Sequence, residues 1–276
     1  YELCYTEHKN TKATIKLLDK EHYTLMSTGE VFECNHIENR ADNKAQVSQS
    51  LKRLRDYINT NVIDVSCCKW ITLTYKENMQ DTKKLYIDFK NFIKRFKYKY
   101  GHFEYIVAME PQARGAWHCH CIIIFNKKAP FIPNNIIENL WQHGFTKTNK
   151  LDDIDNIGAY LTAYLGDIEY SEEYGNEKQY NIKVVEKIGN MKLKKSKKFI
   201  KGGRLYMYPP NFNLYRISRG IKPPKKEYYQ YSYIKEKAGL TEPTYSKALK
   251  LSDTDNNFSN KIIYEYYNTK RASKKV

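Results

Sequence analysis

The stretch that decides the fold is residues 110–120, which read EPQARGAWHCH. Its last residues open an apolar run, 117–125, whose length and composition predict a buried β-strand. Side chains of a strand alternate between its two faces. His118 and His120 are therefore expected on one face, and the two cysteines of the run on the other.

A hairpin is expected to join this strand to the apolar stretch before it, Glu104 to Glu110, through a turn that contains Gly115. The hairpin would return the Glu110 carboxylate to the side of His118 and His120. Two imidazoles and one carboxylate form a mixed nitrogen and oxygen ligand set, which suits Mn²⁺ more than Mg²⁺. Both imidazoles must be neutral to bind a cation, so the site should weaken in acid.

Forty residues further on, residues 160–164 read YLTAY. A helix is expected from Asp153 to Leu165, and it would place Tyr160 and Tyr164 on one face because they are four residues apart. A phenol is a poor nucleophile near neutral pH, since its ordinary pKa is about 10. A cation that polarises a phosphate would lower that barrier and stabilise the charge that develops on the phosphate oxygens.

These motifs together resemble the HUH endonuclease superfamily, in particular the rolling-circle replication initiator (Rep) proteins of small plasmids and phages. The resemblance covers residues 44–166. The motifs that carry it are ITLTY (71–75), Glu110, HCH (118–120), WQHGF (141–145) and the tyrosine pair. The tyrosines follow the histidines, as in Rep proteins, whereas relaxases of the same superfamily carry the tyrosine near the N-terminus.

The alternation of helices with hairpin-linked strands predicts an α+β fold. The resemblance implies an antiparallel β-sheet of about five strands flanked by helices, with a basic C-terminal extension. It also implies Glu110, His118 and His120 as ligands of Mn²⁺ or Mg²⁺, and attack by Tyr160 or Tyr164 on single-stranded DNA. The products would be a 5′-phosphotyrosine adduct and a free 3′-OH. Tyr160 is favoured as the first nucleophile because relatives place it at this distance after the WQHGF segment.

One position departs from the family pattern. Many relatives carry a Lys three residues after the nucleophile, where this chain has Ala163, and Asp167 holds the same offset from Tyr164. Two alternatives therefore stay open: an origin-binding protein without catalysis, and an HUH transposase. The expected partners are single-stranded or hairpin origin DNA and, because the sequence has no phosphate-binding Gly-rich loop of an NTPase motor, a host helicase and polymerase.

The charge is strongly positive and unevenly placed. The 276 residues carry a net charge of +16 with a pI near 9.3, which indicates an anionic partner. Residues 183–276 hold 23 basic and 7 acidic residues, whereas residues 1–182 are balanced at 24 of each. Basic residues interleaved with aromatic ones suit single-stranded DNA. The candidate DNA-binding residues are Arg114, Lys194, Lys195, Lys197, Lys198, Lys201, Arg204, Tyr206 and Tyr208.

These patterns divide the chain into four segments. We expect an N-terminal segment (1–43), a catalytic domain (44–166), an acidic loop or insertion (167–182) and a basic DNA-binding region (183–276). Helices are expected over 43–59, 81–98, 134–141, 229–238 and 262–267, strands over 68–75 and 144–149, a hairpin over 24–34, and a disordered end over 269–276.

Several motifs also have simpler interpretations. The His-Cys-His-Cys run could bind zinc, but strand alternation turns its thiols away from the imidazoles. His143 could be a structural histidine rather than a ligand, Arg114 a solvated turn charge, and the lysines a solvated face. A tyrosine pair four residues apart is usually helix packing in a chain with 25 tyrosines.

Targeting signals are missing from the sequence. No stretch approaches the roughly 20 apolar residues of a membrane span, and no signal-peptide pattern is visible. The six cysteines do not form a disulfide framework. These observations predict a cytoplasmic protein with no role at a membrane.

Overall fold

The structure is a computed structural model that describes residues 1–9, 14–36, 40–149, 151, 158, 165–171, 179, 181–188, 191–253 and 258–268. The chain forms two compact units. Unit 1 combines residues 1–36 with residues 225–276, and unit 2 comprises residues 37–224. Unit 2 contains the His-Cys-His strand and is therefore the unit that carries the candidate site.

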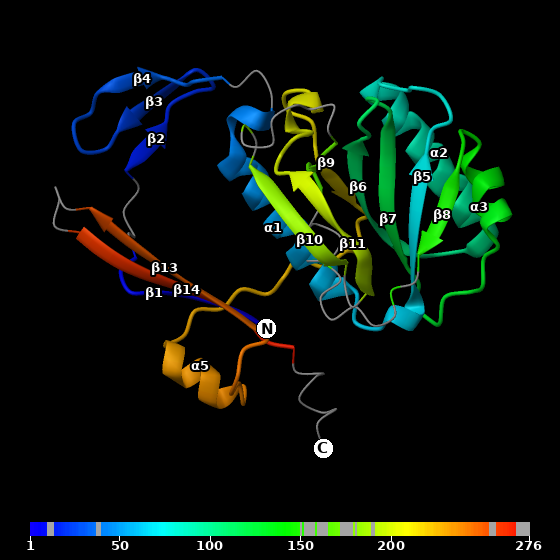
Figure 1. Ribbon diagram of the computed structural model, residues 1–276. Coiled ribbons are helices and arrows are strands. Elements are labelled where there is room, and N and C mark those ends of the chain that lie inside the picture. Colours follow the sequence, from blue (N-terminus) through cyan, green and yellow to red (C-terminus); the bar gives the residue numbers. More distant parts are fainter. Residues whose placement is uncertain are drawn as a thin grey trace. The chain divides into compact units, whose positions relative to one another are not determined.

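Unit 2 is built on a five-stranded antiparallel sheet (Figure 1). The strand order is β12-β6-β7-β5-β8. Its strands are β5 (Cys68–Thr74), β6 (Glu104–Pro111), β7 (Trp117–Ile124), β8 (Thr146–Asn149) and β12 (Tyr215–Ile217). The predicted hairpin is β6–β7, and β7 is the central strand. The α+β prediction with a five-stranded antiparallel sheet is thus confirmed.

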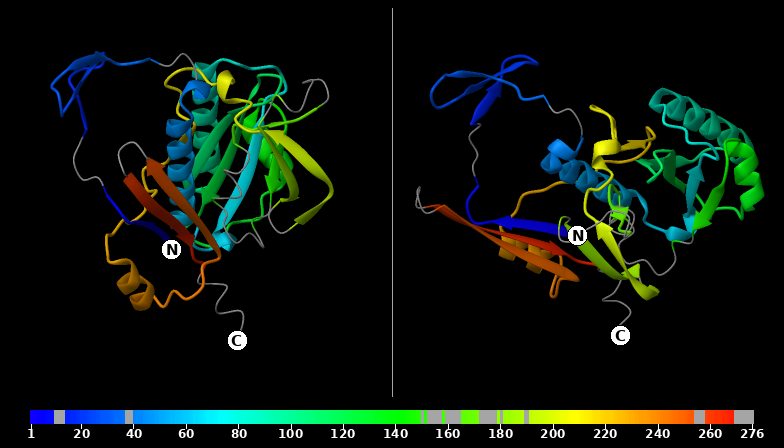
Figure 2. Two further views of the ribbon diagram at one scale, coloured as in Figure 1. Left: turned by 60° about the vertical axis from the view of Figure 1, so that its left-hand side comes forward. Right: turned by 45° about the horizontal axis from the view of Figure 1, so that its top comes forward.

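Helices cover both faces of this sheet (Figures 1 and 2). Helices α2 (Thr82–Tyr100) and α3 (Asn134–Trp141) pack on the face that carries the buried cysteines of β7. Helix α1 (Lys44–Asn61) packs Leu54 and Ile58 on the opposite face, against Ile122 of β7. The histidines lie on the α1 face because they alternate with the cysteines along the strand.

Local sequence explains where these helices begin. The side chain of Asn43 accepts a hydrogen bond from the backbone N–H of Gln46, and that of Asp81 accepts from Lys83 and Lys84. Such caps satisfy backbone donors that have no partner within the helix. The expected helices at 43–59, 81–98 and 134–141 are confirmed to within two residues.

The basic part of the chain belongs largely to unit 2. Strands β9 (Ile168–Glu169), β10 (Ile182–Ile188) and β11 (Met191–Ile200) form an antiparallel sheet in the order β10-β11-β9. Residues 183–224 hold 12 basic residues and one acidic residue. The structure therefore groups the chain differently from the expected segments, because the most basic stretch shares a compact unit with the catalytic motifs.

Unit 1 is formed by both ends of the described chain. Strand β14 (Phe258–Tyr266) pairs with β1 (Glu2–Thr6) on one side and with β13 (Tyr245–Asp253) on the other. A second sheet contains β2 (Ile15–Leu17), β3 (His22–Leu25) and β4 (Val31–Glu33), and α5 spans Tyr231–Lys237. The expected hairpin over 24–34 and helix over 229–238 are confirmed.

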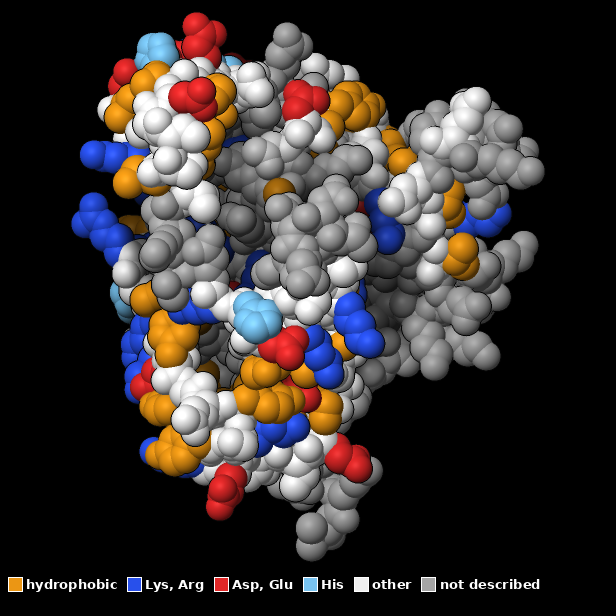
Figure 3. Space-filling model, turned by 90° about the vertical axis from the view of Figure 1, so that its left-hand side faces the viewer, with side chains coloured by type: hydrophobic (Ala, Val, Ile, Leu, Met, Phe, Trp, Pro, Cys, Tyr) orange, Lys and Arg blue, Asp and Glu red, His pale blue; other side chains and the backbone are white. Residues whose placement is uncertain are grey.

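Unit 1 exposes aromatic rings beside cations. Tyr228, Tyr229 and Tyr233 are exposed, and the ammonium groups of Lys9 and Lys237 lie over these rings at 4.5–6.0 Å from the centroids. Figure 3 shows exposed hydrophobic side chains lying among Lys and Arg side chains on one face of the molecule.

The expected helix at residues 262–267 is wrong. These residues belong to β14, where a tyrosine-rich, β-branched stretch pairs with two neighbouring strands. Long-range pairing overrides the weak local pattern on which the helix rested. The expected helix at 153–165 lies almost entirely outside the described residues, and the expected disordered end at 269–276 lies wholly outside them. Within the described part of the chain, no helix has the length and hydrophobicity needed to span a membrane.

A candidate metal centre on the central hairpin

The β6–β7 register brings the three predicted ligands together. Glu110 pairs with His118, and Ala108 pairs with His120. On the other side of β7, Thr74 lies opposite His118 and Thr72 opposite His120. Residues paired across an antiparallel ladder share a face. The hairpin therefore places one carboxylate and two imidazoles on the α1 face of the sheet.

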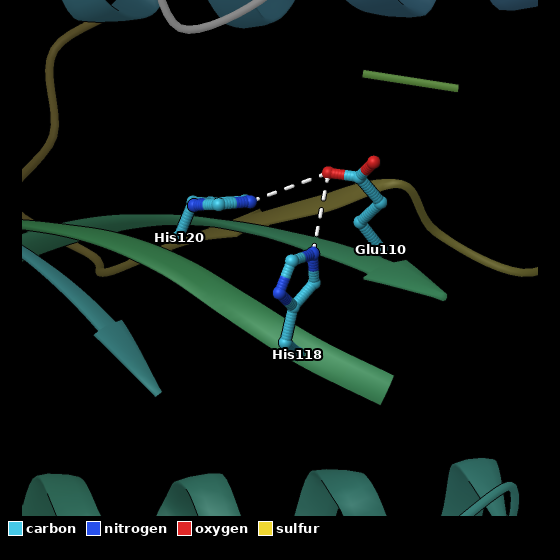
Figure 4. A group of neighbouring side chains, drawn as sticks. All are labelled: Glu110, His118 and His120. Carbon is cyan, nitrogen blue, oxygen red and sulfur yellow. Dashed lines mark ion pairs between the residues drawn. The ribbon is translucent and has the colours of Figure 1, made fainter. Parts of the chain in front are cut away.

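The three side chains converge on one point (Figure 4). Glu110 Oε2 lies 3.5 Å from His118 Nε2 and 3.3 Å from His120 Nε2. The two imidazole rings are 4.5 Å apart between centroids and nearly perpendicular, at 68°. The ligand atoms all lie within 4.8 Å of one another, so the group can hold a metal ion. The identity of the ion does not follow from this geometry.

The surroundings keep both imidazoles neutral. Burial lowers the pKa of His118 to about 3, with a further contribution from His120, and burial lowers the pKa of His120 to about 4. Desolvation disfavours the charged imidazolium in each case. A neutral imidazole presents a nitrogen lone pair, which is the form that binds a cation.

The donor set fits a divalent cation. His118 Nε2 is buried and has no hydrogen-bond partner among the described residues, although it points at Glu110. A buried polar nitrogen without a partner is costly, and a cation at this point would satisfy it. His120 Nδ1 lies 3.4 Å from Thr72 Oγ1. If Nδ1–H donates to this hydroxyl, Nε2 keeps its lone pair directed at the same point.

A fourth side chain reaches the cluster from outside the hairpin. The Nη1 of Arg204 donates to Glu110 Oε1, the carboxylate oxygen that does not face the imidazoles. The Arg204 side chain is only 19% exposed, and its Nε is buried without a partner among the described residues. Arg204 was expected to bind DNA from an exposed basic run, and the structure instead places it on a predicted metal ligand.

The predicted nucleophiles, Tyr160 and Tyr164, lie outside the described residues. Described residues on either side of them are held within unit 2. Gly158 donates its backbone N–H to Asn59 Oδ1 on α1 at 3.1 Å. The Gly166 carbonyl accepts a hydrogen bond from the backbone N–H of Arg204 at 2.8 Å.

The turn that holds Gly166 also contacts the metal centre. Gly202 donates its backbone N–H to Asp167 Oδ1 at 2.8 Å, two residues before Arg204, whose side chain contacts Glu110. The chain just beyond Tyr164 is therefore tied to the same turn that reaches the predicted ligands.

The cysteines and His143 take no part in the candidate centre. Cys119 and Cys121 are fully buried on the α2 face, where burial raises the pKa of each thiol. The zinc-cluster interpretation is excluded for these two residues because they face away from the imidazoles. His143 Nε2 lies 3.4 Å from Asp88 of α2, which also accepts the Tyr75 hydroxyl, so His143 belongs to a separate polar cluster.

Two other DNA-binding candidates have structural contacts. The Arg114 guanidinium donates to the carbonyls of Tyr75 and Lys76, and so ties the β6–β7 turn to the loop after β5. Tyr208 is 2% exposed and packs against Trp117. The prediction that Tyr208 stacks on a base needs correction, because a buried ring cannot reach one.

The remaining candidates lie on β11 and the turn after it. Lys194, Lys195 and Lys197 belong to β11, of which the structure describes the backbone alone at these positions. Lys198, Lys201 and Tyr206 are exposed. These three side chains lie on the surface, where a DNA backbone and its bases can contact them.

The comparisons with known proteins gave one match. Residues 68–169 match the family model of the replication-associated protein ORF2. No curated protein and no solved structure matches the chain significantly. The matched range contains β5, the metal cluster and the predicted tyrosine pair. It supports a replication-associated protein, and the histidine-rich cluster is compatible with a nuclease.

Proposed function

We propose that this chain initiates rolling-circle replication by nicking and rejoining single-stranded DNA. The observation that carries the proposal is the convergence of Glu110, His118 and His120 on one point, within the range that matches a replication-associated family. The ties of Gly158 and Gly166 to unit 2 add support, because they restrain the segment that carries the tyrosines.

The proposed reaction is a transesterification. The phenol oxygen of Tyr160 forms a bond to phosphorus, the bond from phosphorus to the 3′ oxygen breaks, and the leaving oxygen takes up a proton. The products are a 5′-phosphotyrosine adduct and a 3′-OH that can prime synthesis. Because the phosphodiester energy is kept in the adduct, Tyr164 or the 3′-OH itself can reverse the step without ATP.

The residues of the hairpin supply the conditions for this step. Glu110, His118 and His120 would hold Mn²⁺ or Mg²⁺, which polarises the scissile phosphate and stabilises charge on its non-bridging oxygens. Burial keeps both imidazoles neutral and ready to bind. Thr72 orients the His120 ring. The exposed Lys198 and Lys201 would bind the DNA backbone, and a host helicase would open the duplex.

The experiment measures covalent adduct and its polarity. Single-stranded DNA from the replicon that encodes the chain is labelled at the 3′ end, incubated with Mn²⁺ and protein, and separated on a denaturing gel. A 5′-phosphotyrosine adduct carries the 3′ label into the protein band. The His118→Ala, His120→Ala double variant should lose this band, as should wild-type protein in a chelator.

The tyrosine variants test the nucleophile. We expect Tyr160→Phe to lose first-strand cleavage and Tyr164→Phe to keep it. Full adduct formation by the Tyr160→Phe, Tyr164→Phe double variant would remove tyrosine from the mechanism. Salt-sensitive DNA binding without any adduct would favour the non-catalytic origin-binding alternative, and cleavage confined to hairpin ends of a mobile element would favour the transposase.

A further inference from the structure

Arg204 is a charged residue that the proposed reaction leaves without a task. Its Nη1 donates to Glu110, and within the described residues this is the only hydrogen-bond partner of its side chain. A guanidinium has five N–H donors, and the Nε–H of Arg204 is buried and unpaired among those residues. The contact with Glu110 therefore leaves most of its hydrogen-bonding capacity unused.

The charges in the site make this contact more than a packing detail. Glu110 carries one negative charge, both imidazoles are neutral, and Arg204 carries one positive charge, so the cluster is neutral before a cation enters. A divalent cation would raise the total to two positive charges in a largely buried place. Charges within a few ångströms in such a place interact strongly.

Arg204 also lies where a scissile phosphate has to lie. Its side chain touches a predicted metal ligand, and its backbone N–H holds Gly166, two residues beyond Tyr164. A phosphate attacked by a tyrosine of this segment and polarised at the metal centre must come between the two. An arginine fork matches the paired oxygens of a phosphate.

We propose that Arg204 is a shared counter-ion: it pairs with Glu110 while the centre is empty, and it binds the non-bridging oxygens of the scissile phosphodiester once a cation has taken Glu110. This inference rests on the proposed function. It makes the binding of cation and DNA interdependent, because each compensates charge that the other leaves. Thermodynamic linkage then requires the coupling to be equal in both directions.

The proposal predicts the sign of a charge deletion. Arg204→Gln keeps an N–H donor for Glu110 but removes the positive charge. Mn²⁺ should then bind about tenfold more tightly without DNA, because repulsion and competition for Glu110 both disappear. A residue that only held Glu110 in place would act in the opposite direction, since loss of such partners weakens metal affinity roughly 10–100-fold.

The experiment measures Mn²⁺ binding to the full chain by the electron paramagnetic resonance signal of free Mn²⁺. Arg204→Lys, which keeps the charge, should stay close to wild type. Arg219→Gln removes the same charge from an exposed position in unit 2 and should leave Mn²⁺ affinity unchanged. Circular dichroism establishes that each variant is folded.

The second arm adds an oligothymidylate of about 30 nucleotides to the Tyr160→Phe, Tyr164→Phe background, which prevents cleavage. DNA should strengthen Mn²⁺ binding about tenfold with Arg204 present and clearly less with Arg204→Gln. Unchanged or weaker Mn²⁺ binding by Arg204→Gln, or equal coupling in both proteins, would overturn the proposal.

These outcomes are separable from failure of the proposed function. Wild-type protein that binds no Mn²⁺ would remove the metal centre itself, and this is seen before any variant is measured. Wild-type protein that binds Mn²⁺ but forms no covalent adduct would overturn the nicking reaction, whereas the binding data would still decide the role of Arg204.

Discussion

Burial of two neutral histidines should make metal-free unit 2 sensitive to mild acid. The folded-state pKa values of about 3 for His118 and about 4 for His120 lie below the ordinary value of 6.5. Above that value both states are neutral, and the histidines do not affect stability. As the pH falls through 6.5, the unfolded chain takes up protons that the folded chain does not, so stability is lost.

The size of the effect follows from these values. At about pH 5, each histidine should have cost about 2 kcal/mol of unfolding free energy, or about 4 kcal/mol together. The loss should continue down to the folded-state pKa values and then level off. Saturating Mn²⁺ should offset it, because a cation present at about 100 times its dissociation constant adds about 2.7 kcal/mol.

The assay is urea unfolding in chelator, followed by tryptophan fluorescence. Trp70, Trp117 and Trp141 are the three tryptophans of the chain, and all lie in unit 2. The signal therefore reports on the unit that carries the site. The His118→Asn, His120→Asn double variant is the reference, and it should lose about 4 kcal/mol less between neutral pH and about pH 5. Parallel pH profiles for the two proteins would refute the reasoning.

Three further outcomes are expected. Cys119→Ala should destabilise unit 2 by about 1–2 kcal/mol through a small cavity and leave Mn²⁺ affinity unchanged, which calorimetry and Mn²⁺ titration can measure. Gly158→Ala would place a Cβ 2.7 Å from the Arg55 carbonyl oxygen, so adduct formation should slow up to about 100-fold while Mn²⁺ binding persists. Lys198→Gln and Lys201→Gln should each lower the salt dependence of DNA binding by about one unit of the logarithmic slope, measured by fluorescence anisotropy over a salt series.

Much of unit 2 could be predicted from the sequence because its signals are local. The alternation of His118 and His120 with two cysteines specified both the strand and its faces. One turn containing Gly115 was enough to place Glu110 opposite His118. The caps at Asn43 and Asp81 marked helix starts through side-chain hydrogen bonds with their own helices.

The features that the sequence did not reveal depend on contacts between distant residues. Arg204 reaches Glu110 across 94 positions of the chain, and nothing in a run of lysines distinguishes the one basic residue that turns inward. Tyr208 looked like its exposed neighbour Tyr206, yet it packs on Trp117. Two glycines just before Arg204 were the available signal, since they permit a tight turn.

The β1–β14 pairing has a consequence for biosynthesis. Leu3 pairs with Glu265, so unit 1 cannot close until nearly the whole sequence has left the ribosome. Unit 2 is complete by residue 224 and can fold earlier, as domains generally do during translation. Interrupted synthesis would therefore release a formed catalytic sheet whose companion strands still lack their partner.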